Sequence, residues 1–167
     1  MDTKKLTYSA LILGLALVFQ SLRLIVPIPP VVAPFVIGSL VNACLLIATT
    51  TVGLKSGLII SLITPFVAYM QGQLPLPLFI VPIFIGNGLL VSCYWLLERK
   101  ARIAAVVVAA LAKTIALFIM FSALLAFISL PDKLATALMF TMSWPQLVSG
   151  VAGGVIAIIV LFRIKHK

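Results

Sequence analysis

The stretch ARIAAVVVAALAKTIALFIMFSALLAFI, residues 101–128, places one lysine, Lys113, at the centre of a long apolar segment. At about 1.5 Å per residue, a helix of this length crosses the hydrocarbon core of a bilayer. A cation at the centre of such a helix costs from ~3 to ~10 kcal/mol, depending on the method of estimate. Lys113 therefore requires a partner side chain, a polar cavity or a bound ligand.

The composition assigns the rest of the chain to the membrane as well. Of its 167 residues, 63% are hydrophobic and 9% are charged, and the mean hydropathy is +1.32. A soluble domain of this size cannot bury so many apolar side chains. We expect an all-α integral membrane protein, a compact bundle of six transmembrane helices that forms a single domain over residues 1–167. The expected spans are 6–25, 35–52, 56–71, 78–97, 102–128 and 137–162.

The distribution of cations predicts the orientation of these spans. If both termini are cytoplasmic, the outer loops hold only Lys133, and nine cations lie on the inner side: Lys4, Lys5, Lys55, Arg99, Lys100, Arg102, Arg163, Lys165 and Lys167. Such a bias is typical of cytoplasmic segments. The formal net charge of +9 is thus mainly a topology signal. Nucleic acid is not expected as a partner, because no polar domain presents a basic groove.

Polar residues inside the spans form a candidate site. Counted from the outer ends, Asn42 lies about 10 Å down the second helix and Asn87 about 13 Å down the fourth, and Gln146 is near the start of the last. The side chain of Lys113 extends toward the same level, so these groups can line one pocket in the outer half of the bundle. The two asparagines could instead bond neighbouring helices.

Two further residues near the outer surface have two possible roles each. Arg23 could steer or clamp an anion, or it could anchor the end of the first helix at the interface. Trp144 could stack on a flat ligand, or it could belong to an interfacial aromatic belt.

No acidic residue is placed to neutralise Lys113. Asp2 is at the amino terminus, Glu98 is in a cytoplasmic turn and Asp132 is in the third outer loop. A buried amine without a partner either loses its proton or binds an anion. We favour a bound anion, which makes the missing charge part of the substrate.

The connections and the small residues carry weaker signals. The outer loop over residues 71–77 is rich in glutamine and proline, and it could be a lid or an ordinary helix end. Small residues four apart, Ala10 and Gly14, suggest a close helix contact on the first span. Similar patterns in the last two spans are expected to pack within the bundle; they comprise Ala105, Ala109, Ala112, Ala116, Gly150, Gly153 and Gly154.

Enzyme chemistry has little support in this sequence. No metalloprotease pair, nucleophile elbow or phosphate-binding loop is present, and the single histidine, His166, is in the basic tail. We therefore expect no catalytic residue, no metal and no cofactor. Nucleotide hydrolysis, if uptake requires it, must come from a separate subunit.

Several segments together resemble one family. They are Ala10-Leu-Ile-Leu-Gly14, the proline-bearing loop after Arg23, residues 38–42 (GSLVN), residues 53–57 (GLKSG) and residues 143–146 (SWPQ). They look like the S component, the substrate-capture subunit, of energy-coupling factor (ECF) transporters. The resemblance implies a multi-pass protein of a bacterial or archaeal plasma membrane that binds a vitamin or related micronutrient from outside. It also implies two kinds of partner, a transmembrane coupling subunit and two ATPase subunits.

The resemblance further implies that Ala10 and Gly14 contact the coupling subunit, with glycine in place of the family's second alanine. For the substrate, a lipoate-, pantothenate- or biotin-like acid fits Lys113, while a flavin, a queuosine precursor or another neutral ring stays open. Two other functions also stay open. One is a stand-alone channel or carrier for small solutes, and the other is a membrane scaffold that transports nothing.

Overall fold

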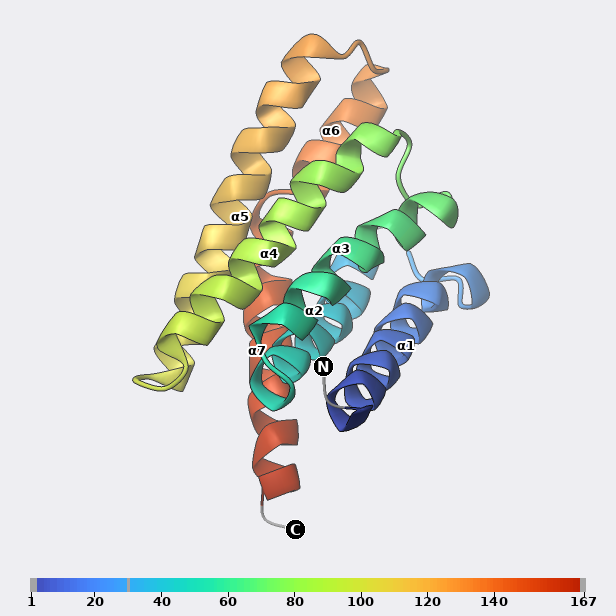
Figure 1. The fold of residues 1–167 in the computed structure, drawn as a ribbon. Coiled ribbons are helices and arrows are strands. Elements are labelled where there is room, and N and C mark those ends of the chain that lie inside the picture. Colours follow the sequence, from blue (N-terminus) through green and yellow to red (C-terminus); the bar gives the residue numbers. More distant parts are fainter. Residues whose placement is uncertain (1–2, 30, 166–167) are drawn as a thin grey trace.

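The computed structural model describes residues 3–29 and 31–165. Asp2, Pro30, His166 and Lys167 lie outside the described residues. Within those ranges the chain is helical and contains no strand, which confirms the predicted all-α fold (Figure 1). The helices in chain order are α1 (Thr3–Ile25), α2 (Ala33–Thr51), α3 (Leu54–Met70), the short 3₁₀ helix η1 (Pro77–Phe79), α4 (Ile80–Leu97), α5 (Arg102–Phe127), α6 (Asp132–Thr141) and α7 (Trp144–Lys165).

One predicted span is wrong. The apolar pattern predicted a single helix over 137–162, with Asp132 in a loop, but the chain forms α6 from Asp132 and a separate α7 from Trp144. The two helices meet at Met142 and Ser143, and Pro145 lies in the first turn of α7. Proline is favoured there because it has no amide hydrogen and the first turn needs none. This break determines where α6 can lie relative to the bundle.

Apolar helices of spanning length fill most of the chain. Five segments of the described chain are long and apolar enough to cross a membrane: α1, α2, α5, the joined η1 and α4 (Pro77–Leu97), and α6 with α7 (Asp132–Ile164). The remaining helix, α3, has 17 residues and extends about 26 Å at the usual helical rise, slightly less than a hydrocarbon core. A multi-pass membrane protein is thus supported. The count of six spans, the cytoplasmic termini and the single domain over 1–167 stay predictions.

Helix α7 packs closely against two neighbours through its glycines. A Cβ atom on Gly153 would lie 2.6 Å from the main-chain oxygen of Ser39 in α2. One on Gly150 would lie 2.8 Å from the Cβ of Ala110 in α5, and one on Gly154 would collide with Val106. Only residues without a side chain allow such approach, so the predicted internal packing of these glycines is confirmed.

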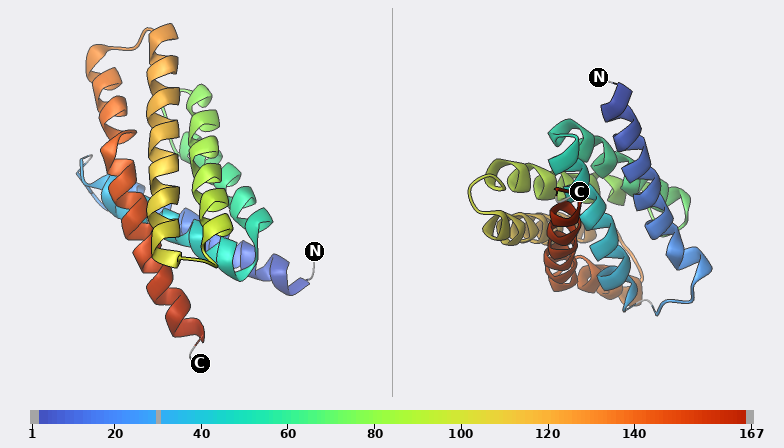
Figure 2. Two further views of the ribbon diagram at one scale, coloured as in Figure 1. Left: turned by 90° about the vertical axis from the view of Figure 1, so that its left-hand side faces the viewer. Right: turned by 90° about the horizontal axis from the view of Figure 1, so that it is seen from below.

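Helix α1 is attached much more loosely. It runs at a steep angle to α5 in the left view of Figure 2. Only 11% of the residues in its most apolar 18-residue stretch are buried inside the protein. Its contacts include a hydrogen bond of 2.8 Å from the hydroxyl of Ser56 in α3 to that of Ser9. Most of the apolar surface of α1 therefore faces lipid or another protein.

Candidate ligand-binding cavity

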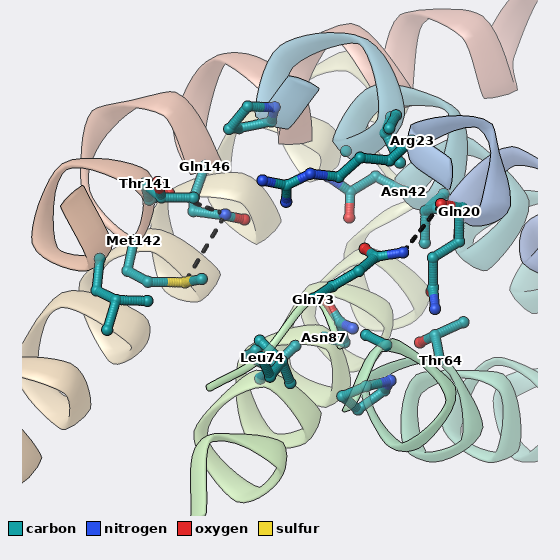
Figure 3. Close-up of a pocket in the computed structure, with 18 of the residues that line it drawn as sticks. Gln20, Arg23, Asn42, Thr64, Gln73, Leu74, Asn87, Thr141, Met142 and Gln146 are labelled. Atoms are coloured by element: carbon teal, nitrogen blue, oxygen red, sulfur yellow. Dashed lines mark hydrogen bonds between the residues drawn. The ribbon is translucent and has the colours of Figure 1, made fainter. Parts of the chain in front are cut away.

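A cavity of about 330 Å³ lies where α1 ends and α7 begins, at the end of the bundle that is predicted to face outward (Figure 3). Every helix from α1 to α7 contributes to its wall, together with the segment 71–79 between α3 and α4, which we call the strap. Its polar lining consists of Gln20, Arg23, Asn42, Thr64, Gln73, Asn87, Lys113, Thr141 and Gln146. The size is within the range of small-molecule sites.

Lys113 lies at this cavity and is only 4% exposed. Its Nζ donates a hydrogen bond of 2.7 Å to Oδ1 of Asn42, whose Nδ2 lies 3.5 Å from the hydroxyl of Ser149. That hydroxyl in turn donates to the main-chain oxygen of Gln146 at 3.2 Å. The lysine therefore has a partner, but the partner is a neutral amide that brings no negative charge.

The acidic residues of the described chain do not reach this cavity. The carboxylate of Glu98 accepts a hydrogen bond of 2.7 Å from Thr50 near the opposite end of the bundle. Asp132 lines a second, more open hollow of about 590 Å³ beside α6. The two cavities share Ala137 and Thr141, so α6 is a thin wall between them.

Arg23 and Asn87 also line the cavity, as does Gln146. Figure 3 shows the side chain of Arg23 extending across the cavity toward Gln146, above the amide of Asn42. The structure therefore brings together five of the residues that the sequence singled out: Arg23, Asn42, Asn87, Lys113 and Gln146.

Trp144 is not part of the lining. Its ring packs against Phe35, with centroids 5.3 Å apart, and edge-on against Phe140, at 5.7 Å. The residue is 54% exposed. These contacts join the start of α7 to α2 and α6, which gives the tryptophan a packing role at the rim.

The glutamines on the opposite side of the cavity were not among the predicted site residues. Gln73 in the strap and Gln20 in α1 both line it, and Gln71 connects them through hydrogen bonds of 2.7 Å and 3.3 Å to its Oε1. Gly72 turns the chain between the two strap glutamines with a φ of 70°, which suits glycine. The unusual density of glutamine in this loop was the only signal in the sequence.

An apolar surface completes the wall. Leu74 of the strap packs in one cluster with Leu138 of α6 and Met142, which follows that helix. Behind them, Phe79 stacks on Phe121 of α5 with ring centroids 5.0 Å apart. The cavity thus combines two cations and several amides with a hydrocarbon side.

The described residues contain no cluster of histidine, cysteine and acidic side chains that could hold a metal ion.

A family model described as "ECF transporter, substrate-specific component" matches residues 4–164. The chain belongs to this family. No curated protein and no solved structure matches it.

Membership of the ECF S components gives the cavity its context. These proteins are membrane-embedded, substrate-binding subunits of transporters rather than enzymes, and they work with a membrane coupling subunit and ATPases. The resemblance read from the sequence is thereby confirmed. For this S component, the family leaves the substrate undetermined.

Proposed function

We propose that this S component captures a micronutrient bearing a carboxylate, and that Lys113 binds the acid group. One observation supports this above all: Lys113 is buried at a cavity whose lining includes no acidic residue, and its hydrogen-bond partner is the neutral amide of Asn42. A substrate carboxylate would supply the charge that the described residues around the cavity do not.

The hydrogen-bonding capacity of the amine agrees with this role. An ammonium group has three donors, and one is directed to Asn42. Two donors remain for a ligand. Charge-assisted hydrogen bonds are roughly twice as strong as neutral ones, so a carboxylate would gain more here than an uncharged group.

Arg23 strengthens the same proposal. It reaches the cavity from the last turn of α1, while Lys113 reaches it from the middle of α5. Two cations from different helices create a positive field in a cavity with apolar walls, where such fields are weakly screened. We propose that Arg23 attracts the acid and that Lys113 holds it. Asn42 orients Lys113, while Asn87 and Gln146 supply neutral contacts.

For the assembled transporter we propose a coupling subunit and two ATPase subunits in a bacterial or archaeal plasma membrane. The contact with the coupling subunit includes Ala10 and Gly14, which are both exposed on α1. The ligand would then enter from outside, at the end of the bundle that the cation bias assigns to the outer face.

The test compares Lys113→Met with Lys55→Met in protein purified with its natural ligand. Mass spectrometry of extracted small molecules should find an acid bound to wild type and to Lys55→Met, since Lys55 is exposed at the start of α3. Lys113→Met should lose this ligand by at least roughly a hundredfold, because the charge-assisted bonds and the counter-charge both disappear. Methionine has a similar shape and no charge, so the variant should stay folded.

Three results would contradict the proposal. Retention of the same acid by Lys113→Met would exclude the lysine as its binding group. Transport by the chain alone in proteoliposomes would instead indicate an independent channel or carrier. A scaffold would retain no ligand in any variant.

A further inference from the structure

The hydrogen bonds around Gln71 fix the direction of three side-chain amides. The hydroxyl of Ser21 donates to the main-chain oxygen of Leu17 at 2.8 Å, so it must accept the bond of 2.9 Å from Nε2 of Gln71. Oε1 of Gln71 then faces the other way. It accepts from the Nε2 atoms of Gln73, at 2.7 Å, and Gln20, at 3.3 Å.

Gln73 consequently presents only an acceptor to the cavity. One of its N–H groups is used by Gln71, and the other donates to the main-chain oxygen of Gln20 at 3.2 Å. A main-chain oxygen can only accept, so this bond alone prevents the amide from turning over. Figure 3 shows the nitrogen of Gln73 directed at Gln20 and its oxygen on the opposite side.

Gln146, across the cavity, has the same polarity. Its Nε2 donates to the main-chain oxygen of Thr141 at 3.0 Å and lies 3.9 Å from the sulfur of Met142. Its Oε1 is directed toward the interior of the cavity in Figure 3. Among the described residues, no group donates a hydrogen bond to the side-chain oxygen of Gln73 or of Gln146.

We infer that the substrate carries N–H or O–H groups that donate to Gln73 and Gln146, in addition to the acid bound by Lys113. This inference rests on the proposed function of the cavity. When a ligand displaces water, an oxygen left without a donor loses its hydration without compensation. An acid with two such donors, for example a hydroxyl together with an amide, or the two N–H groups of a urea, can satisfy both oxygens. A simple alkyl acid satisfies neither.

The experiment measures the affinity of the purified full chain for acids that differ in their donors. Pantothenate has hydroxyl and amide donors, biotin has urea donors, and lipoate and octanoate have none outside the acid. We expect at least one donor-bearing acid to bind roughly 10- to 100-fold more tightly than lipoate and octanoate. In Gln73→Met and Gln146→Met this preference should shrink by about tenfold, because methionine keeps the length but offers only a weak acceptor.

Thr136→Val is the matched control, since Thr136 lines the neighbouring hollow and not this cavity. It should keep the wild-type preference. Equal or tighter binding of the donor-free acids, failure of both donor-bearing acids to bind, or an unchanged preference in both methionine variants would overturn the inference.

A neutral analogue separates this inference from the proposed function. Pantothenol keeps the donors of pantothenate and replaces the acid by an alcohol. If pantothenol binds as tightly as pantothenate and both methionine variants weaken it, the carboxylate proposal fails and the donor inference stands. If the acid is required but the methionine variants change nothing, the donor inference fails and the carboxylate proposal stands.

Discussion

The glycines of α7 and the glycine of α1 have opposite surroundings. A Cβ atom added to Gly153 would meet a main-chain oxygen of α2 at 2.6 Å, whereas one added to Gly14 would find nothing within 4 Å. Both residues belong to small-residue patterns that look alike in the sequence. The pattern therefore identifies a surface that permits close approach, but only the fold shows whether the chain itself already uses that surface.

The difference has a functional consequence. The interface of α7 with α2, which we call the seam, holds Asn42 beside Ser149 and so fixes the partner of Lys113. The exposed face of α1 near Gly14 touches no described part of the site, although Gln20 and Arg23 at the end of the same helix line the cavity. One helix thus joins the cavity to a surface that is open to a partner.

The largest effect is expected from Gly153→Leu in the seam. The new side chain would collide with main-chain atoms of α2, which cannot move away by a change of rotamer as a flexible side chain can. Overpacking of this kind costs about 3 kcal/mol, and it would also separate Asn42 from Ser149. Thermal unfolding in detergent should show a large loss of stability together with loss of ligand. A stable variant with normal affinity would contradict the close packing of the seam.

Gly14→Leu should produce a selective effect. Because nothing lies within 4 Å of the added Cβ and leucine favours a helix more than glycine does, stability should not fall and ligand affinity should match that of wild type. Association with the coupling subunit should weaken by tenfold or more, about 1.4 kcal/mol, because the close approach of two helices is blocked. Co-purification of the complex measures this. Undiminished assembly of Gly14→Leu and of Ala10→Leu would exclude this face as the contact.

How much of the site was visible in the sequence depended on where the polar residues lie. Lys113, Asn42 and Asn87 stand inside apolar runs, where a polar group is costly and so draws attention. Gln20 and Gln73 lie near the end of a helix and in a loop, where polar residues are ordinarily solvated. Their convergence arises from the approach of the strap to α1, which no local pattern encodes.

The helices were predictable for a related reason, and the prediction was wrong at one point. Hydropathy located the helices because each must satisfy its main-chain groups internally in lipid. Hydropathy continues across Met142 and Ser143, so it concealed the break between α6 and α7. The one sequence feature that indicates the break is Pro145, because proline favours the first turn of a new helix.

The smallest effect should come from Gly38→Ala, a change in the same seam as Gly153. Here the added Cβ would lie 3.1 Å from the Cβ of Ser149 and 3.2 Å from its hydroxyl oxygen, so a side chain rather than a main chain must yield by a few tenths of an ångström. Alanine favours the helix by about 1 kcal/mol over glycine, which offsets much of this crowding. The free energy of unfolding should therefore change by less than about 1 kcal/mol.

Ligand affinity, measured in parallel, should fall only a few-fold, because Ser149 supports Lys113 indirectly through Asn42. A loss as large as that of Gly153→Leu would mean that the seam tolerates no added atom anywhere, and that contact with main chain is not what distinguishes its two glycines.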